Sequence, residues 1–367
     1  MQSTLEMIKV LNSKQSRELD RLSIEKNTDL DKLIDSAGKA LSCHVMENIS
    51  DPFERSFLCV SGTGNNGMDA IVCNYYLNKN HVNSKLLITS PKDVDCQYLE
   101  KYTKNLDFIA MDDFNDISRY DYIIDGLFGT GLNRDIDGIY LNLINKIKQH
   151  DNIIAVDLAS GVRTDSGRVV NSHINAKQTV TFTYPKLCHF LGDGYSSTGD
   201  LYIYEIGHST KSLDDINVHV IEKKDIHRKI KSKDKKTNKY SNSKVITLCG
   251  SKKYTGASLL SSISAMRAGV KILKKLVPSS LAQISYQQLE AIDILIEDDN
   301  KGYLDLEKYN DLAPELAWSD ALLIGPGLDD SNDSIFLISK ILSEYLGRCV
   351  IDATAFKTIS RGELIFD

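Results

Sequence analysis

The sequence predicts an α/β protein made of two consecutive units, each with a mostly parallel sheet. Short apolar runs, typical of buried parallel strands, alternate along the chain with amphipathic segments of helical period. Several of these runs end in glycine-rich loops, as parallel strands do before a crossover helix. With 367 residues the chain is too long for one typical domain, and its length fits two.

The first unit is expected over residues 1–226. Its first helix is expected to be capped by Ser13, and a second helix to start at Thr28, which pairs with Asp31 in a capping box. An uncharged apolar run, 57–60, then predicts the opening strand. The remaining expected elements are helices over 68–77, 94–105 and 139–149, and strands at 86–89, 122–125, 153–157, 179–183 and 201–206.

The second unit is expected over residues 241–367. A lysine-rich segment, 227–240, precedes it and is predicted to be a solvated linker, since five lysines fall between residues 229 and 236. A basic recognition patch is the alternative for this segment. The unit then shows a strand at 245–248, an amphipathic helix over 258–275, and strands at 321–324 and 349–351.

The composition narrows the class of protein. The chain is 42% hydrophobic and 26% charged with a net charge of −6, which gives no electrostatic argument for nucleic acid or a membrane surface as partner. No apolar run reaches the ~18 residues of a membrane span, and no secretory signal is visible. Seven cysteines without C-x-x-C spacing predict reduced thiols and a cytoplasmic protein.

A glycine-rich loop follows the opening strand. Gly62, Gly64 and Gly67 let the backbone turn sharply and approach a ligand, and free N–H groups at the next helix N-terminus favour a phosphate. The spacing also fits the G-x-G-x-x-G fingerprint of dehydrogenases, which requires an acidic residue after the second strand. Residues 89–91 are Thr-Ser-Pro instead. The loop therefore predicts a phosphate or nucleotide site, and a dehydrogenase is disfavoured.

Three aspartates follow predicted strands of the first unit. Asp69, Asp125 and Asp157 lie at or just beyond the carboxyl ends, where ligands bind in open α/β sheets, so we expect them to converge. Each could instead cap a helix or turn. Asn66 and Ser160 add amide and hydroxyl oxygens, and this set suits a group I or II cation rather than zinc.

Together these stretches resemble the NAD(P)H-hydrate epimerase family, and the order of elements is similar to the bifunctional NAD(P)H-hydrate repair enzymes. In the first unit the resemblance rests on SGTGNNGMDA (61–70), DGLFGTGLNRDIDG (125–138), VDLASGVRTDSG (156–167) and the segment 181–207. The second unit resembles the ribokinase-like ADP- or ATP-dependent dehydratase domain through GSKKYTGASLL (250–260), AMRAGVKI (265–272), ALLIGPGL (321–328) and VIDATAF (350–356). A Rossmann-like three-layer domain followed by a partial ribokinase-like domain is implied.

The resemblance implies that the first unit interconverts the R and S hydrates of NADH and NADPH, which carry a hydroxyl at C6 of the nicotinamide ring. Asp157 is the candidate for acid–base catalysis and Asp69 the second choice. Potassium ligands fall on Asn66, Asp125 and Ser160. Substrate contacts fall on Asn65, Asn66, Gly67, Met68, Asp69, Gly129, Thr130, Gly131, Leu132, Asn133, Arg134, Asp135 and Asp157, and in the second unit on Ala257 and Gly327.

The chain departs from the family pattern in three ways. Met68 stands where glycine is usual, so its side chain must turn away from the site, and Ala159 replaces a proline. The family's dehydratase domain continues beyond 350–356 with further substrate and catalytic segments, so we expect no dehydratase activity, with ADP or ATP, from this chain. A non-catalytic nucleotide-binding protein on the same fold is the alternative, and a homodimer is the default assembly.

Overall fold

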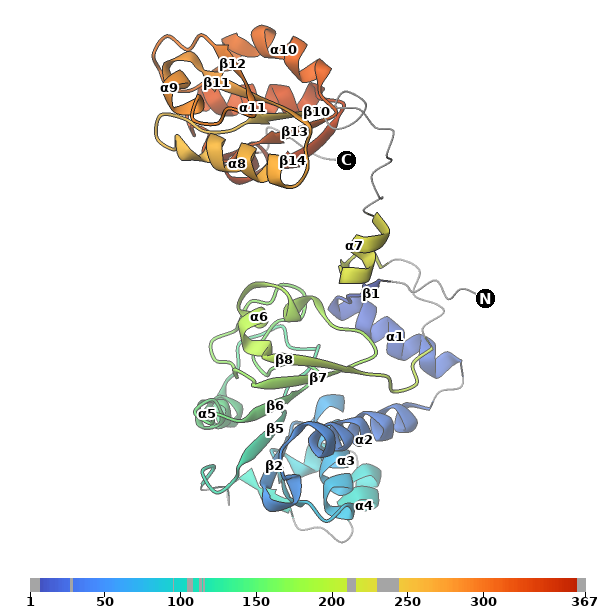
Figure 1. The fold of residues 1–367 in the computed structure, drawn as a ribbon. Helices are drawn as coiled ribbons and strands as arrows, with labels where there is room; N and C mark the ends of the chain where they lie inside the picture. Colours follow the sequence, from blue (N-terminus) through green and yellow to red (C-terminus); the bar gives the residue numbers. More distant parts are fainter. Residues whose placement is uncertain are drawn as a thin grey trace, which may run out of the picture. The chain divides into compact units, whose positions relative to one another are not determined.

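The computed structural model describes residues 7–26, 29–94, 96–103, 108–111, 114, 116–209, 216–229 and 244–361. The chain divides into two compact units, Met1–Ile230 and Lys231–Asp367. Each unit has its own sheet and its own apolar core (Figure 1).

The first unit is built on a seven-stranded sheet in which every strand pairs in parallel. In spatial order the strands are β4 (Phe108–Ala110), β3 (Asn83–Ile88), β2 (Ser56–Ser61), β5 (Tyr122–Gly126), β6 (Ile153–Val156), β7 (Gln178–Phe182) and β8 (Asp200–Tyr204). The chain runs outward from β2 to β4 and then continues at β5 on the other side. Ligands bind at such a reversal of strand order, beyond the carboxyl ends of the strands.

Helices cover both faces of this sheet. The helices of this unit are α1 (Ser13–Glu25), α2 (Leu30–Asn48), α3 (Asn65–Lys79), α4 (Cys96–Thr103), α5 (Gly138–Ile147), α6 (Gly192–Thr198) and α7 (Lys223–Lys229). Phe57 and Cys59 of β2 belong to the apolar cluster with α2 and α3, whereas Leu58 and Val60 pack with α5 on the opposite face. Figure 1 shows α5 on one side of the strands and α2 and α3 on the other. The predicted three-layer α/β class is confirmed.

The first two helices start from different caps than expected. Asn12, not Ser13, caps α1: its side chain accepts a hydrogen bond from the Gln15 backbone N–H, and the Gln15 side chain accepts one from the Asn12 N–H in return. Asp29 caps α2 by accepting from the Asp31 N–H. Thr28 lies outside the described residues.

The second unit has a five-stranded sheet, again with every strand parallel. Its strands in spatial order are β12 (Ile292–Ile296), β11 (Ile272–Pro278), β10 (Lys244–Leu248), β13 (Ala321–Ile324) and β14 (Arg348–Ile351). Its helices are α8 (Gly256–Arg267), α9 (Ala282–Ser285), α10 (Tyr309–Trp318), α11 (Asn332–Glu344) and α12 (Phe356–Ser360).

The helix predicted over 258–275 is wrong in its second half. Helix α8 ends at Arg267, and Gly269 takes a left-handed φ of 102°, which terminates a helix. Residues from Ile272 onward form β11, a buried strand between β10 and β12.

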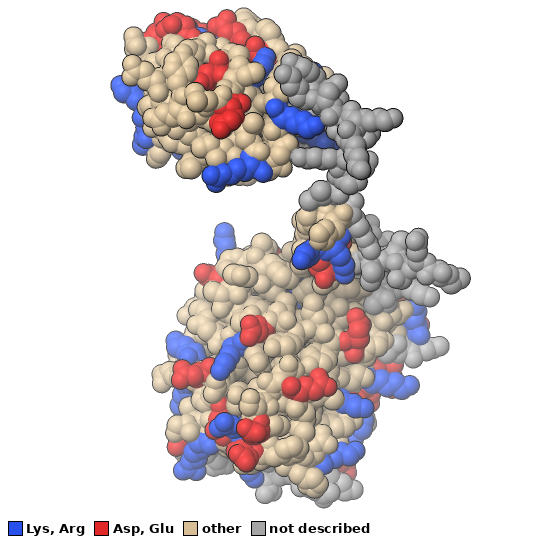
Figure 2. All heavy atoms as spheres, in the orientation of Figure 1, with Lys and Arg blue, Asp and Glu red and all other residues tan. Residues whose placement is uncertain are grey.

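The chain ahead of the second unit is described only in part. A two-residue strand, β1 (Ile8–Lys9), pairs antiparallel with β9 (His219–Val220), and helix α7 follows. Of the predicted linker, 227–229 are the end of α7, and 230–240 lie outside the described residues. Among the helices that the structure describes, none is long and apolar enough to cross a membrane. On the face seen in Figure 2, acidic and basic side chains of the first unit are interspersed.

Candidate functional site

A cavity of about 490 Å³ lies at the carboxyl ends of the central strands of the first unit. Its walls come from the loops after β2, β5, β6 and β7, and from α1 and α2. The lining residues are Leu11, Ser16, Arg17, Leu19, Asp20, Leu30, Leu33, Ile34, Ala37, Thr63, Gly64, Asn65, Asn66, Asp69, Leu127, Phe128, Gly129, Thr130, Gly131, Leu132, Asn133, Arg134, Tyr140, Asp157, Phe182, Lys186, Ile206 and His208.

Most first-unit residues that the resemblance implies for the substrate line this cavity, but three do not. Gly67 packs against the loop backbone, where a Cβ would lie 2.0 Å from the Gly62 carbonyl oxygen. Met68 packs against the apolar cluster of α2 and α3, so its side chain turns away as the sequence required. Asp135 is exposed outside the cavity wall.

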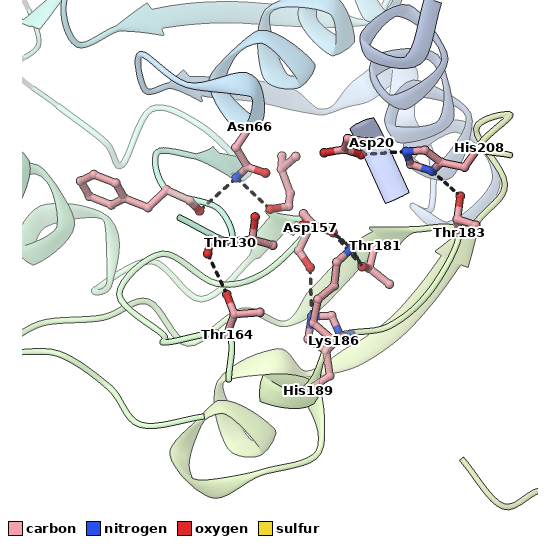
Figure 3. Close-up of polar contacts among 12 residues, drawn as sticks. Asp20, Asn66, Thr130, Asp157, Thr164, Thr181, Thr183, Lys186, His189 and His208 are labelled. Carbon is pink, nitrogen blue, oxygen red and sulfur yellow. Dashed lines mark hydrogen bonds and ion pairs between the residues drawn. The ribbon is translucent and has the colours of Figure 1, made fainter. Parts of the chain in front are cut away.

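Asp157 follows β6 in a strained backbone conformation. Its φ is 64°, in the left-handed region that non-glycine residues seldom adopt, and its N–H donates to the Val180 carbonyl at 2.8 Å. Its Oδ1 forms an ion pair with Lys186 and accepts a hydrogen bond from the Thr181 hydroxyl at 2.8 Å. Figure 3 shows these side chains together beside the ring of His189. The strain is therefore tied to a carboxylate that faces the cavity.

Lys186 and His189 are site residues that the sequence reasoning missed. Lys186 is almost fully buried, and its ammonium also donates to the Thr181 hydroxyl at 2.9 Å. The Nδ1 of His189 accepts from the Lys186 N–H at 3.1 Å, so Nε2 carries the proton and donates to the Asp157 carbonyl at 2.9 Å. Burial and the Lys186 charge lower the pKa of His189 to about 4, which keeps this ring neutral. The sequence did contain one signal for Lys186, because it is the single charged residue in the segment 184–188.

The pKa values of Asp69 and Asp157, two of the carboxyl groups that line the cavity, are shifted in opposite directions. Burial, the charge of Asp157 and that of Asp20 raise the pKa of Asp69 well above its ordinary value, and Lys186 only partly opposes this. Burial also acts to raise the pKa of Asp157, but the Lys186 charge and the hydrogen bonds from Lys186 and Thr181 outweigh it and leave the pKa lowered. Asp69 therefore holds its proton more strongly than an ordinary carboxyl group, and Asp157 less strongly.

Asp125 lies outside the cavity wall and is 0% exposed. Its oxygens accept hydrogen bonds from the Ser160 N–H at 2.9 Å, the Ser160 hydroxyl at 2.7 Å and the Leu127 N–H at 3.2 Å. Burial raises the pKa of Asp125 to about 6, against those hydrogen bonds. Within the described part of the chain, no basic side chain pairs with it. A buried carboxylate that has only neutral donors suits a bound cation.

Asn66 lines the cavity and also lies close to the loops that hold Asp125 and Ser160. Its Nδ2 donates to the Phe128 carbonyl at 3.0 Å and to the Val156 carbonyl at 2.9 Å, as Figure 3 shows around the labelled Asn66. The Phe128 N–H in turn donates to the Ser160 hydroxyl at 2.9 Å. Asn66, Asp125 and Ser160 are therefore brought together around one loop, whereas Asp69 and Asp157 face the cavity beside it.

In the second unit the structure brings Ala257 and Gly327 into contact. A Cβ on Gly327 would lie 2.4 Å from the Cβ of Ala257, and Gly327 takes a φ of 67°. The loops after β10 and β13 therefore approach closely, and a side chain at Gly327 would separate them.

Each of the two units matches a known protein family. Residues 30–188 match the family model described as YjeF-related protein N-terminus, and residues 245–366 match the model described as NAD(P)H-hydrate dehydratase. The bifunctional NAD(P)H-hydrate repair enzyme Nnr of Dictyoglomus turgidum is 28% identical over 96% of this chain and 71% of its own length. The corresponding enzyme of Thermofilum pendens is 27% identical over 98% and 70%.

A shorter relative matches the first unit alone. The NAD(P)H-hydrate epimerase of Limosilactobacillus reuteri is 31% identical over 153 residues, which cover 41% of this chain and 72% of that protein. The cavity that contains Asp69 and Asp157 lies in the unit that this relative matches. The chain therefore belongs to the NAD(P)H-hydrate repair enzyme family, with an epimerase-type unit followed by a dehydratase-type unit.

Proposed function

We propose that the first unit interconverts the R and S hydrates of NADH and NADPH. The observation that carries this proposal is the pair Asp69 and Asp157, which line one cavity with pKa values displaced in opposite directions. Epimerisation at C6 needs a proton donor for the departing hydroxyl and an acceptor for the incoming water. Such acid–base assistance contributes roughly 10²–10⁴ in rate.

The reaction uses Asp69 as the acid and Asp157 as the base, so the acid–base role expected of Asp157 alone is divided between the two residues. Asp69 protonates the C6 hydroxyl, the C6–O bond breaks, and the lone pair of N1 forms an N1=C6 double bond. Water and a ring cation result. Water then adds to the opposite face of C6, Asp157 accepts its proton, and N1 regains its lone pair. The return reaction uses the two groups in the opposite order, and solvent restores the protons.

The remainder of the cavity fits the dinucleotide. Helix α3 begins after Gly64 without a side-chain cap, so its first N–H groups are available to a phosphate. Arg17 and Arg134 are exposed side chains on the cavity lining, and no ion-pair partner is found for either among the residues described. Both are free to bind the negative charges of a pyrophosphate.

We also propose that Asn66, Asp125 and Ser160 hold a potassium ion. Support comes from the buried Asp125 carboxylate, which lacks a cationic partner in the described part of the chain, and from the oxygen donors around it. A bound ion would fix the loops after β2, β5 and β6 and supply positive charge next to the cavity. It takes no chemical step.

The direct test is to incubate the full chain with pure R hydrate and to follow the appearance of the S form by chromatography. Acceleration over the spontaneous reaction is expected. A rate equal to the background would contradict the proposal. Adding S hydrate with ADP or ATP to the same preparation tests the second unit, and the return of NADH absorbance would show dehydratase activity.

Potassium is expected to raise the melting temperature by a few degrees relative to tetramethylammonium at equal ionic strength, since a ligand bound only to the folded state stabilises it. Differential scanning fluorimetry measures this. In Asp125→Ala the two salts should give the same melting temperature. A salt effect that survives this substitution would place the ion elsewhere.

Asp69→Asn is expected to stabilise the protein near pH 7 relative to the unchanged protein. In the unfolded chain this carboxyl ionises around 3.8, whereas folding raises its pKa. The folded state therefore holds a proton that the unfolded state has lost, and stability falls as the pH rises from about 4 toward the folded pKa. Asparagine removes that loss.

Urea unfolding from pH 4 to pH 8 checks this expectation. The stability difference between Asp69→Asn and the unchanged protein should be largest at high pH and shrink toward pH 4. A variant that becomes less stable than the unchanged protein as the pH rises would show that folding favours the ionised Asp69 carboxylate, and would contradict the expectation. The variant should also lose most of its epimerase activity, which would set stability against function at this position.

A further inference from the structure

A chain of hydrogen bonds on the cavity wall involves residues that the reaction described above does not use. Nε2 of His208 lies 2.9 Å from Oδ1 of Asp20, and Nδ1 of His208 lies 2.8 Å from the Thr183 hydroxyl. Asp20 belongs to α1, whereas His208 follows β8, 188 positions later. Figure 3 shows Asp20 between His208 and the rest of the site.

Thr183 occupies an unfavourable backbone conformation that aims its hydroxyl at His208. It follows β7 with a φ of 59°, which is rare for a β-branched residue, and its N–H donates to the Tyr204 carbonyl at 2.8 Å. Asp157 shows the same strain at the end of the neighbouring strand. Strained residues at the ends of two adjacent strands, both bonded to groups that line one cavity, indicate a functional arrangement.

The chain of bonds holds a carboxylate against the cavity. The His208 side chain is 6% exposed and Thr183 is buried, whereas the Asp20 side chain is 42% exposed. Both Asp20 and His208 line the cavity. Only Oδ1 of Asp20 is bonded among the described residues, so Oδ2 is available. The imidazole that holds Asp20 is buried and bonded at both ring nitrogens, so it fixes the carboxylate better than an exposed partner would.

Before the C6 hydroxyl leaves, neither Asp157 nor Asp69 presents an unbalanced negative charge to the cavity. The charge of Asp157 is balanced by Lys186, and Asp69 enters the reaction as a neutral acid. One ring proton is enough for both bonds of His208, since Nε2–H can donate to Asp20 while Nδ1 accepts from the Thr183 hydroxyl. Asp20 then supplies the uncompensated negative charge on the cavity wall.

We propose that Asp20 is a third acidic residue of this site, oriented by His208 and Thr183, and that it stabilises the cationic ring formed when the C6 hydroxyl leaves. The inference rests on the proposed epimerase function and adds a residue to it. No proton moves to or from Asp20. A fixed negative charge near a developing cation lowers the energy of the transition state more than that of the neutral hydrate.

Two stable dinucleotides provide the probe. NAD⁺ carries a positive nicotinamide ring and NADH a neutral one, while the rest of the molecule is the same. The full chain should bind NAD⁺ more tightly than NADH in titration calorimetry. Asp20→Asn keeps an oxygen that accepts from His208 but removes the charge. It should reduce the preference about tenfold, at the lower end of what a nearby opposite charge does to an ionisation equilibrium, and lower kcat with little change in KM.

The control is Asp165→Asn. Asp165 also accepts hydrogen bonds from α1, at the Ser13 N–H and hydroxyl, but it does not line the cavity, so this variant should keep the preference for NAD⁺. His208→Ala should lose part of the preference, and His208→Gln, which can still donate to Asp20, should restore it.

The outcomes separate this inference from the proposed function. An active epimerase that binds NAD⁺ and NADH equally, or an Asp20→Asn variant with unchanged preference, would overturn the role of Asp20 alone. An unchanged protein without epimerase activity that binds neither dinucleotide would overturn the proposed function and the inference with it.

Discussion

Asp157→Asn is expected to lower the rate of epimerisation by roughly 10²–10⁴, the usual contribution of one acid–base group. Asparagine keeps the size of the side chain and can still accept from Thr181 and Lys186. It cannot take the proton of the incoming water. The dinucleotide should still bind, because the loop of residues 129–134 and the start of α3 are unchanged.

The measurement combines chromatographic rates on the R hydrate with calorimetric binding of NADH. Asp151→Asn is a matched control, since Asp151 is an exposed aspartate just before β6, at the opposite end of the same strand. That variant should keep the full rate. If Asp157→Asn retained the full rate, the base would be another group. If the unchanged protein bound NADH but did not accelerate epimerisation, the chain would be a nucleotide-binding protein on this fold.

Much of the fold was predictable because buried parallel strands leave a strong signal. The run 57–60 has apolar residues facing both sides, and the structure divides these between two apolar clusters. The failure over 258–275 has a local cause: Gly269 lies inside an amphipathic pattern, and a glycine there does not by itself show where a helix ends. The sequence analysis also did not predict strands β11 and β12.

The candidate site was predictable where topology alone brings residues together. Asp69 and Asp157 follow strands of one parallel sheet, so their meeting follows from the strand order. Lys186, His208 and Asp20 reach the cavity through loop conformations and an N-terminal helix, which no spacing rule describes. The division of acid and base between Asp69 and Asp157 also depends on Lys186, whose side chain forms an ion pair with Asp157.

Lys186→Met is expected to move the acid limb of the pH–rate profile upward by about 1–3 pH units, the effect of removing a close opposite charge from a carboxylate. Activity needs Asp157 ionised, so the rate rises with pH through the pKa of Asp157. Lys186 lowers that pKa against the effect of burial. Without the ammonium, burial is opposed less strongly, so the pKa of Asp157 rises and the rate falls at the acidic end of the profile.

The sign of the shift separates this role of Lys186 from a purely structural one. Raising the pH should restore much of the rate of Lys186→Met, because ionising Asp157 recovers the base, whereas a collapsed cavity would stay inactive at every pH. The basic limb should move upward as well, since Lys186 also lowers the pKa of Asp69. Lys186→Arg keeps the positive charge, so its acid limb should stay near that of the unchanged protein. Circular dichroism shows whether each variant is folded. A folded Lys186→Met protein whose acid limb stays in place would mean that a group other than Asp157 controls it.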